Sequence, residues 1–158
     1  PWHQDGAYWP IRPLATCTVW IAVDDATPEN GCMRFIPGSH KSKTLAEHAV
    51  NNDPDYTLNQ ELDPATYDPA EAVDVTLEAG QISLHDVYLF HGSEVNRSPQ
   101  PRRGMTLRLM PTSSVYDRAM AAEIHATKGG YNQAKRTIFL MRGTDRSGAN
   151  DFRVQQAV

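Results

Sequence analysis

Short hydrophobic runs separated by polar turns dominate the chain. The run Leu14–Val23 is rich in β-branched and aromatic residues and is followed by the breaker run Thr27–Gly31. Six further runs also predict strands: Met33–Pro37, Val73–Leu77, Gln81–Leu84, Tyr88–Phe90, Arg103–Met110 and Thr137–Met141. Short strands at modest spacing are typical of a β-sandwich or a jelly-roll barrel.

Two stretches have weak helical character. Ser42–Val50 and Asp117–Ala126 both place apolar residues at helical spacing. Between them, residues 51–72 carry several prolines and acidic residues without periodicity, which predicts a long loop. Long loops inside compact domains often serve as lids or binding segments, and we expect this one to form part of a lid.

Composition describes one globular domain, residues 1–158. The chain has 15 basic and 19 acidic side chains, a net charge of -4 and 40% hydrophobic residues. A mildly acidic chain lacks the charge expected for binding nucleic acid or an anionic membrane, so we expect a small-molecule substrate. No apolar run approaches the ~20 residues that span a bilayer.

The two cysteines suggest a cellular compartment, and the first residues suggest whether the domain is complete. Cys17 and Cys32 lie in apolar stretches, which favours free thiols in a reducing, cytoplasmic compartment; the alternative is a disulfide between paired strands. The chain begins at Pro1, and the dense cluster Trp2–Asp5 follows at once. The first residues of natural domains are usually poorly ordered and without such clusters, so we expect the domain to lack an N-terminal portion.

Six histidines prompt a search for a metal site. His3 and Asp5 stand at i and i+2, so on an extended strand they point from one face and can reach one ion. His91 is the best candidate for a third ligand, because it follows the apolar run Tyr88–Phe90 and precedes a turn. Two histidines and one carboxylate form the facial triad of non-heme Fe(II) oxygenases, which leaves the opposite coordination face open.

The remaining histidines are weaker candidates. His40, which follows a turn, and His48, on the expected helix, are interpreted as structural or exposed residues, and His125 has no partner at ligand spacing. His85 and Asp86 are adjacent, and neighbouring side chains on a strand point to opposite faces. A closed structural zinc site is disfavoured because neither cysteine has a ligand at the required spacing.

Arg102 follows His91 by eleven residues, across a loop that we expect to return the chain beside the His91 strand. Side chains alternate between the two faces of an extended strand. One face carries Arg102, Gly104, Thr106 and Arg108, and the other carries Arg103, Met105, Leu107 and Leu109. If the first face points inward, Arg102 can bind the far carboxylate of a dicarboxylate cosubstrate. Alternation alone leaves open that this face is the outer, solvated one.

Four segments together resemble the phytanoyl-CoA dioxygenase family of Fe(II)/2-oxoglutarate-dependent oxygenases. They are PWHQDGAYWPIRP, TVWIAVDD, PENGCMRFIPGSHK and LFHGSEVNRSPQPRRGMTLRLMP, which lie between residue 1 and residue 111. The resemblance implies a double-stranded β-helix (jelly-roll, cupin-like) fold with a few short helices. It implies that iron is held by His3, Asp5 and His91, that the 5-carboxylate of 2-oxoglutarate meets Arg102, and that Ser93, Gln4 and Trp20 line the 2-oxoglutarate site.

The resemblance also implies an activity. The expected enzyme is a dioxygenase that uses Fe(II), 2-oxoglutarate and O2 to hydroxylate a C–H bond of a small organic substrate, with release of succinate and CO2. Hydroxylation is favoured over halogenation because halogenating relatives replace the carboxylate ligand with a small residue, and Asp5 is present here. The alternatives are a non-catalytic metal-binding jelly-roll module and a cupin-like isomerase or hydrolase that uses another divalent ion.

Overall fold

The computed structural model describes residues 1–153 apart from positions 55 and 57. Its packing divides the chain into two compact units. The first unit comprises Pro1–Ala7 and Cys17–Leu109, and the second comprises Tyr8–Thr16 and the residues from Met110 onward. The division concerns packing alone, and the expectation of a single domain stays a prediction.

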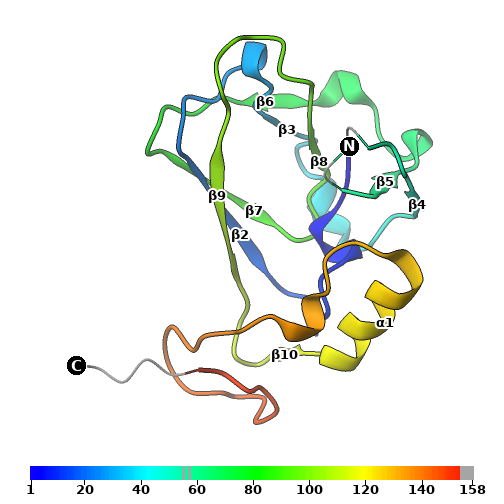
Figure 1. Ribbon diagram of the computed structural model, residues 1–158, viewed down its shortest axis with the longest axis vertical. Helices are drawn as coiled ribbons and strands as arrows, with labels where there is room; N and C mark the ends of the chain where they lie inside the picture. Colours follow the sequence, from blue (N-terminus) through cyan, green and yellow to red (C-terminus); the bar gives the residue numbers. More distant parts are fainter. Residues whose placement is uncertain (55, 57, 154–158) are drawn as a thin grey trace. The chain divides into compact units, whose positions relative to one another are not determined.

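Two three-stranded antiparallel sheets form the first unit (Figure 1). One sheet has the order β7 (Ile82–Asp86), β2 (Cys17–Ala22), β9 (Gly104–Leu109), and the other the order β6 (Val73–Val75), β3 (Met33–Phe35), β8 (His91–Ser93). A small pair, β4 (His48–Val50) with β5 (Gln60–Leu62), completes the strands of this unit. Short 3-10 helices lie at Asp5–Ala7, Pro28–Asn30, Ser39–Ser42, Pro64–Thr66 and Pro69–Glu71.

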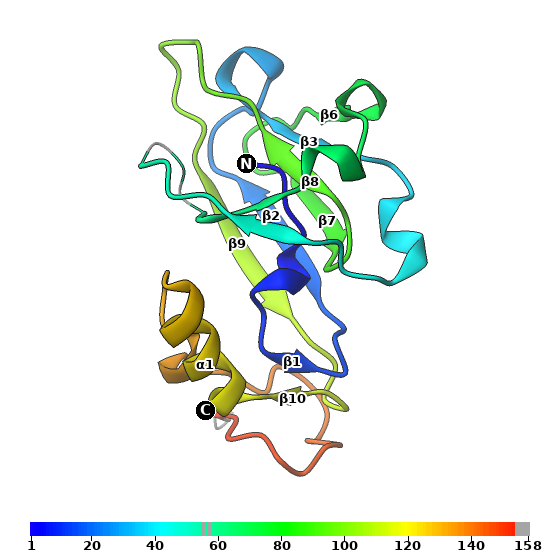
Figure 2. The same ribbon diagram turned by 90° about the vertical axis from the view of Figure 1, so that its right-hand side faces the viewer.

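The core of the first unit lies between the two sheets (Figure 2). Trp20 and Ala22 of β2 belong to the same buried cluster as Met33 of β3, and Phe35 and Val75 pack against that cluster. Strand β2 alternates buried and half-buried residues, as expected for a strand with one face on a core. Two sheets that share one core confirm the predicted mainly-β jelly-roll architecture.

Strand β9 decides which face Arg102 belongs to. Met105, Leu107 and Leu109 are exposed on the outer face, together with Ile82 and Leu84 of β7, which pairs with the other edge of β2. The opposite face of β9 carries Thr106 and Arg108, which line a cavity together with Arg102. The face of Arg102 is therefore the inner one, and the alternative of an outer, solvated face is wrong.

The second unit is small. Strands β1 (Ile11–Arg12) and β10 (Val115–Tyr116) pair, and α1 (Arg118–Lys128) follows β10. This helix confirms the one predicted over Asp117–Ala126. Asp117 caps its first turn by accepting a hydrogen bond from the Met120 amide. A further 3-10 helix spans Gln133–Lys135. In the described part of the chain, no helix combines the length and apolarity needed to cross a membrane.

Three predicted elements are wrong. The segment expected as a helix, Ser42–Val50, ends in the strand β4, because a run this short cannot sustain a helix against pairing with β5. Residues 51–72, expected as a long loop, contain β5 and two 3-10 helices that Asp63 and Asp68 cap; positions 55 and 57 lie outside the described residues. Residues 137–141 form only one isolated bridge, from Phe139 to Arg153.

The chain around His91 also differs from the prediction. The carboxylate of Asp86 accepts a hydrogen bond from the Tyr88 amide at 2.9 Å, which turns the chain where a strand was expected over Tyr88–Phe90. His91 consequently opens β8 rather than closing a strand. The loop after β8 leads to β9, which pairs with β2 in the opposite sheet and not beside β8.

Both cysteines lie in this fold as free thiols. Cys17 opens β2 and Cys32 precedes β3, so they belong to segments of different sheets. The favoured expectation of free thiols agrees with this placement and stays a prediction.

Candidate metal centre

Backbone pairing brings the two ends of the predicted ligand set together. The amide of His3 donates to the carbonyl oxygen of His91 at 2.8 Å, and the amide of His91 donates back to His3 at 3.0 Å. After this bridge the chain enters the 3-10 helix Asp5–Ala7, whose Gly6 amide donates to the carbonyl oxygen of Val87. This backbone pairing therefore holds the N-terminal candidate ligands next to His91, which is distant in the sequence.

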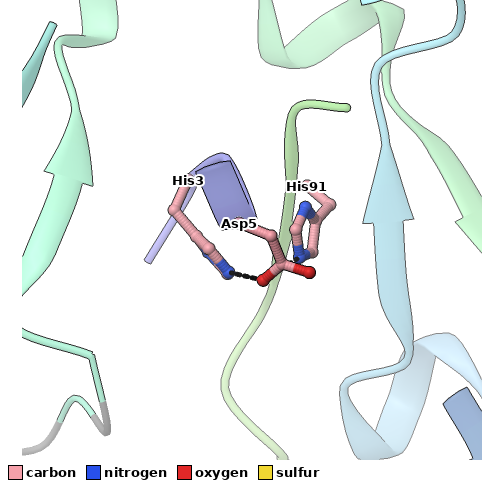
Figure 3. Close-up of side chains that lie close together, drawn as sticks. All are labelled: His3, Asp5 and His91. Atoms are coloured by element: carbon pink, nitrogen blue, oxygen red, sulfur yellow. Dashed lines mark ion pairs between the residues drawn. The ribbon is translucent and has the colours of Figure 1, made fainter. Parts of the chain in front are cut away.

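His3, Asp5 and His91 converge (Figure 3). One potential ligand atom from each residue lies within 4.8 Å of the other two. Asp5 Oδ1 is 3.8 Å from His3 Nε2 and 4.0 Å from His91 Nε2. The side chain of Asp5 is completely buried, while those of His3 and His91 are 12% and 7% exposed. The structure thus assembles the three residues that the sequence singled out as metal ligands.

The second nitrogen of each imidazole fixes its tautomer. His3 Nδ1 lies 2.9 Å from the carbonyl oxygen of Pro1, and His91 Nδ1 lies 2.9 Å from that of Leu89. A carbonyl oxygen only accepts, so each Nδ1 carries the proton and each Nε2 presents a lone pair toward Asp5. Burial lowers the pKa of His91 to about 4 and that of His3 well below its usual value, which outweighs the opposite effect of Asp5.

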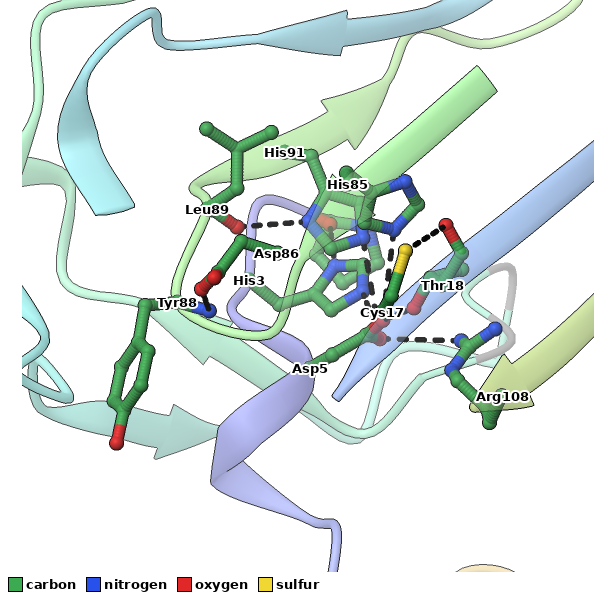
Figure 4. Close-up of polar contacts among 11 residues, drawn as sticks. His3, Asp5, Cys17, Thr18, His85, Asp86, Tyr88, Leu89, His91 and Arg108 are labelled. Atoms are coloured by element: carbon green, nitrogen blue, oxygen red, sulfur yellow. Dashed lines mark hydrogen bonds and ion pairs between the residues drawn. The ribbon is translucent and has the colours of Figure 1, made fainter. Parts of the chain in front are cut away.

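The two oxygens of Asp5 have different neighbours (Figure 4). Oδ1 faces the two histidines and accepts a hydrogen bond from Arg108 Nη2 at 3.2 Å. Oδ2 accepts from the Thr18 hydroxyl at 2.5 Å and lies 3.5 Å from His85 Nε2. Burial raises the pKa of Asp5, but the neighbouring His85, His91 and Arg108 outweigh it and hold that pKa well below its ordinary value. Asp5 is therefore an ionised carboxylate.

These donors fit a divalent metal ion. Two imidazole lone pairs and a carboxylate oxygen are all acceptors, and packing three acceptors together without a cation is electrostatically unfavourable. Both histidines also donate their other nitrogen to a backbone carbonyl, which is the usual arrangement of metal-binding histidines. Two histidines with one carboxylate match the ligand preference of non-heme Fe(II).

A cavity of about 480 Å³ is lined by two of these residues, His3 and His91. Its walls include Trp20, His85, Ser93, Arg102, Thr106 and Arg108, all from the first unit. Tyr56 and Leu58 of the segment 51–72 also line it. The cavity therefore has space for a small molecule next to His3 and His91 and carries two guanidinium groups on its walls.

Arg102 and Trp20 form one wall of the cavity. The guanidinium carbon of Arg102 lies 6.0 Å from the centre of the Trp20 ring, within the range of a cation–π contact. Arg102 Nε is buried and has no hydrogen-bond partner among the described residues. Gly104 makes room for this wall, because a Cβ there would lie 2.1 Å from the Trp20 indole. Such a guanidinium is suited to a carboxylate ligand.

Gln4 has a different environment from the one expected. Its side-chain amide donates to the carbonyl oxygens of Thr44 and Tyr88 at 3.0 and 2.8 Å, and its Oε1 accepts from the Ala46 amide at 2.8 Å. Gln4 is fully buried and does not line the cavity. It ties two backbone segments together, so we do not carry it into the proposed 2-oxoglutarate site, whereas Ser93, Trp20 and Arg102 remain.

Three residues of the site were not singled out for it from the sequence. Thr18 and Arg108 contact Asp5, and His85, which is 5% exposed, lies against His91 with ring centres 4.6 Å apart. Asp86 points the other way and pairs with Lys43, as alternation requires. The same alternation could have pointed to His85. Because adjacent strand residues face opposite sides, Asp86 on the outer side implies that His85 faces inward. The shared face with Arg102 was the signal for Arg108.

A comparison with protein families places these residues in a known context. The family model described as phytanoyl-CoA dioxygenase matches residues 1–104. A phytanoyl-CoA dioxygenase domain-containing protein 1 homolog from Caenorhabditis briggsae is 34% identical over 113 residues, which cover 68% of this chain and 39% of that protein. The chain thus spans well under half the length of this relative.

Solved structures give a consistent picture. EvdO2 from Micromonospora carbonacea var. aurantiaca, crystallised in complex with 2-oxoglutarate, is 32% identical with a TM-score of 0.59, over 68% of this chain and 43% of that one. The apo form of ThoJ, described as a non-heme monooxygenase, is 27% identical with a TM-score of 0.68, over 98% of this chain and 49% of that one.

Proposed function

Because this chain belongs to the phytanoyl-CoA dioxygenase family, we propose that it carries the metal and cosubstrate sites of an Fe(II)- and 2-oxoglutarate-dependent oxygenase that hydroxylates a C–H bond of a small organic substrate. The products of such a reaction are the hydroxylated substrate, succinate and CO2. The proposal concerns the residues present in this chain, which spans 39% of the relative from Caenorhabditis briggsae.

The convergence of His3, Asp5 and His91 at the edge of a cavity that also holds Arg102 carries the proposal. The three candidate ligands alone would be compatible with a metal-binding module of any kind. The guanidinium of Arg102 on the wall of the same cavity has a buried Nε without a hydrogen-bond partner among the described residues, and a dicarboxylate cosubstrate could supply the anion that it is suited to bind. This combination favours an oxygenase that uses 2-oxoglutarate over a metal-dependent isomerase or hydrolase.

The three ligand residues would hold the metal from one side. Asp5 is ionised and both imidazoles are neutral near pH 7, so none of them has to lose a proton to bind the ion. Thr18 and Arg108 fix the plane of the Asp5 carboxylate, and the carbonyl oxygens of Pro1 and Leu89 fix the imidazoles. When bound, Fe(II) with 2-oxoglutarate and O2 supplies the oxidising chemistry.

The cavity walls would position the organic molecules. Arg102 would bind the 5-carboxylate of 2-oxoglutarate, with Trp20 packed beside the guanidinium and Ser93 as a further polar contact. Tyr56 and Leu58 line the cavity from the segment 51–72, which supports the expectation that this segment helps to cover it. Covering the cavity would keep water away from a strong oxidant.

Succinate formation tests this proposal. The purified chain is supplied with Fe(II), 2-oxoglutarate and O2, and succinate is measured with and without a panel of small organic compounds. We expect succinate that depends on O2 and on Fe(II), loss of it in Asp5→Ala, and a large increase in the KM for 2-oxoglutarate in Arg102→Gln. Turnover retained in Asp5→Ala would contradict the metal site, while metal binding without any succinate would favour a non-catalytic module.

A further inference from the structure

We propose that Trp2 is a positioning residue of the metal centre, which holds the strand pair that carries His3 and His91 from the face opposite their imidazoles. The inference rests on the proposed function, because it concerns the metal site assigned there. It adds a role for Trp2, which has none in that function, and explains why the residue after His91 is a glycine.

The backbone around His3 is hydrogen-bonded on both edges. On one edge, the amide and carbonyl groups of His3 pair with those of His91 at 2.8 and 3.0 Å. On the other edge, the carbonyl oxygen of Trp2 accepts from the amide of Leu62 in β5 at 2.9 Å. Successive peptide groups of an extended chain point to opposite sides, as they do here. His3 therefore lies on an extended segment that links β8 to the β4–β5 pair.

Trp2 lies directly opposite Gly92 in this register. His3 and His91 form an antiparallel bridge, so the residue before His3 faces the residue after His91. Neighbouring side chains of an extended segment point to opposite faces. The two imidazoles share one face, with ring centres 4.1 Å apart. The Trp2 indole therefore packs against the strand pair on the face away from the imidazoles.

The indole occupies the space that a side chain at position 92 would need. A Cβ at Gly92 would lie 3.0 Å from Cδ2 and 3.1 Å from Cγ of Trp2. Gly92 is buried, and its φ is not in the left-handed region, so its backbone conformation alone does not require glycine. A glycine inside a strand often marks the close approach of another group. At Gly92 that group is the Trp2 indole.

Two further contacts fix Trp2 itself. Its ring centre is 5.1 Å from that of Tyr67, and the two planes are inclined by 36°, which is the geometry of an aromatic pair. Leu62, which donates to the Trp2 carbonyl oxygen, is fully buried. Both the ring and the backbone of Trp2 are therefore held by the segment that follows β4.

The placement of two candidate ligands depends on this packing. The bridge between His3 and His91 consists of a single residue pair, which gives the two strands little rigidity of their own. Ligand atoms of a metal site have to be held within about 0.5 Å of their productive positions. Removal of the indole leaves a void against the bridge, into which the strands can relax. The Nε2 atoms of His3 and His91 would then present a less favourable geometry to the ion.

The competing interpretation is that Trp2 contributes to stability alone. A purely structural residue lowers the free energy of unfolding when it is replaced, but the protein that remains folded binds the metal with the same affinity and the same spectrum. A positioning residue changes the affinity and the spectrum of the folded protein. The two interpretations are therefore separated by measurements on folded protein.

The experiment measures Co(II) binding to the whole chain, because the absorption of Co(II) depends on the number and arrangement of its ligands. Competition with a chelator gives the affinity, the absorption spectrum reports the geometry, and urea unfolding gives the stability of each metal-free protein. The variants are Trp2→Leu, Trp2→Phe and Gly92→Ala. Binding is measured under conditions in which circular dichroism shows each protein to be folded.

Trp9→Leu is the matched control. Trp9 is 5% exposed and belongs to the core of the second unit, together with Ile11 and Tyr116. The same substitution there removes a packed indole from a different cluster. It therefore measures what the loss of an indole costs in stability alone.

We expect Trp2→Leu and Gly92→Ala to lower the affinity for Co(II) at least about tenfold and to change the spectrum of the bound ion, as is typical for residues that orient metal ligands. Trp2→Phe keeps an aromatic ring over Gly92 and should retain most of the affinity. Trp9→Leu should lower the free energy of unfolding without either effect on Co(II).

Wild-type affinity and spectrum in folded Trp2→Leu would overturn the inference, and so would equal losses of affinity in Trp2→Leu and Trp9→Leu. If Trp2→Leu does not fold, Gly92→Ala decides in the same way, because it displaces the indole without removing it. Failure of the wild-type chain to bind Co(II) at all would instead contradict the metal site of the proposed function, and the wild-type titration detects this separately.

Discussion

Thr18 donates a 2.5 Å hydrogen bond to Oδ2 of Asp5, and this contact turns the other oxygen of the carboxylate, Oδ1, toward His3 and His91. Both residues are buried, so the hydroxyl cannot be replaced by bulk water without rearrangement. Strand β2 thereby sets the orientation of a residue from the N-terminal segment. Asp5 would bind the metal through Oδ1, while Oδ2 stays hydrogen-bonded to Thr18.

Removal of this hydroxyl should weaken metal binding. In Thr18→Val the shape of the side chain is kept, but Oδ2 loses its short hydrogen bond. Loss of such a contact to a metal ligand typically lowers metal affinity about 10- to 100-fold. Titration with Mn(II) or Co(II) measures the effect, and Thr18→Ser is the control that should retain most of the affinity. Equal affinity in Thr18→Val and wild type would show that Thr18 does not orient Asp5.

The stability of the metal-free protein should depend on pH through His91. Burial lowers the pKa of this imidazole to about 4, so between about pH 6.5 and pH 4 the unfolded chain binds more protons than the folded chain. The free energy of unfolding should therefore fall as the pH decreases through this range, by up to about 3 kcal/mol from His91. Burial of His3 acts in the same direction.

Urea unfolding at several pH values, in the presence of a chelator, measures this dependence. His91→Gln removes the titrating group and should flatten the slope between pH 6.5 and pH 4, although its stability at pH 7 also changes. A wild-type slope that persists unchanged in His91→Gln would assign the dependence to other groups.

Gly104 should be intolerant of a side chain. A Cβ at this position would lie 2.1 Å from the Trp20 indole, which is also packed beside Arg102. Gly104→Ala has to displace that ring, at a cost of about 1–3 kcal/mol for overpacking. The affinity for 2-oxoglutarate should fall with it. Met105→Ala is a suitable control, because Met105 is the next residue on β9 and is 51% exposed on the outer face.

Gln4 should be important for stability rather than for cosubstrate binding. Gln4→Ala leaves the Ala46 amide and the carbonyl oxygens of Thr44 and Tyr88 without their present partner. We expect a loss of roughly 2–4 kcal/mol in the free energy of unfolding, since each buried unsatisfied group is costly. The folded fraction should bind 2-oxoglutarate as wild type does. A selective loss of 2-oxoglutarate affinity would restore the original expectation for this residue.

The candidate metal ligands could be singled out from the sequence because their signal is local. His3 and Asp5 are separated by one residue, and His91 precedes a glycine and a serine within a motif that resembles the family. The alternation of β9 likewise separated the face of Arg102 and Arg108 from the exposed face of Met105 and Leu107. The family resemblance is confirmed by the match of residues 1–104.

Features set by long-range pairing were not predictable from the sequence. Ser42–Val50 has a helical pattern, but pairing with β5 and the hydrogen bond from the Gln4 amide to His48 keep its last residues extended. The sheet to which β9 belongs depends on contacts with β2, which no local pattern encodes. Gln4 was assigned by its position in a motif, whereas its side chain is directed by backbone groups distant in the sequence.

An anaerobic titration with Fe(II) and 2-oxoglutarate tests the central claim most directly. Chelation of iron by the keto acid gives a weak visible charge-transfer absorption that free Fe(II) and 2-oxoglutarate alone do not give. We predict that this band appears and saturates at one iron per wild-type chain, disappears in Asp5→Ala, and requires much higher 2-oxoglutarate concentrations in Arg102→Gln. Absence of the band in the folded, iron-loaded wild-type chain, or its undiminished presence in Asp5→Ala, would contradict the assignment of His3, Asp5 and His91 as the iron site of an oxygenase.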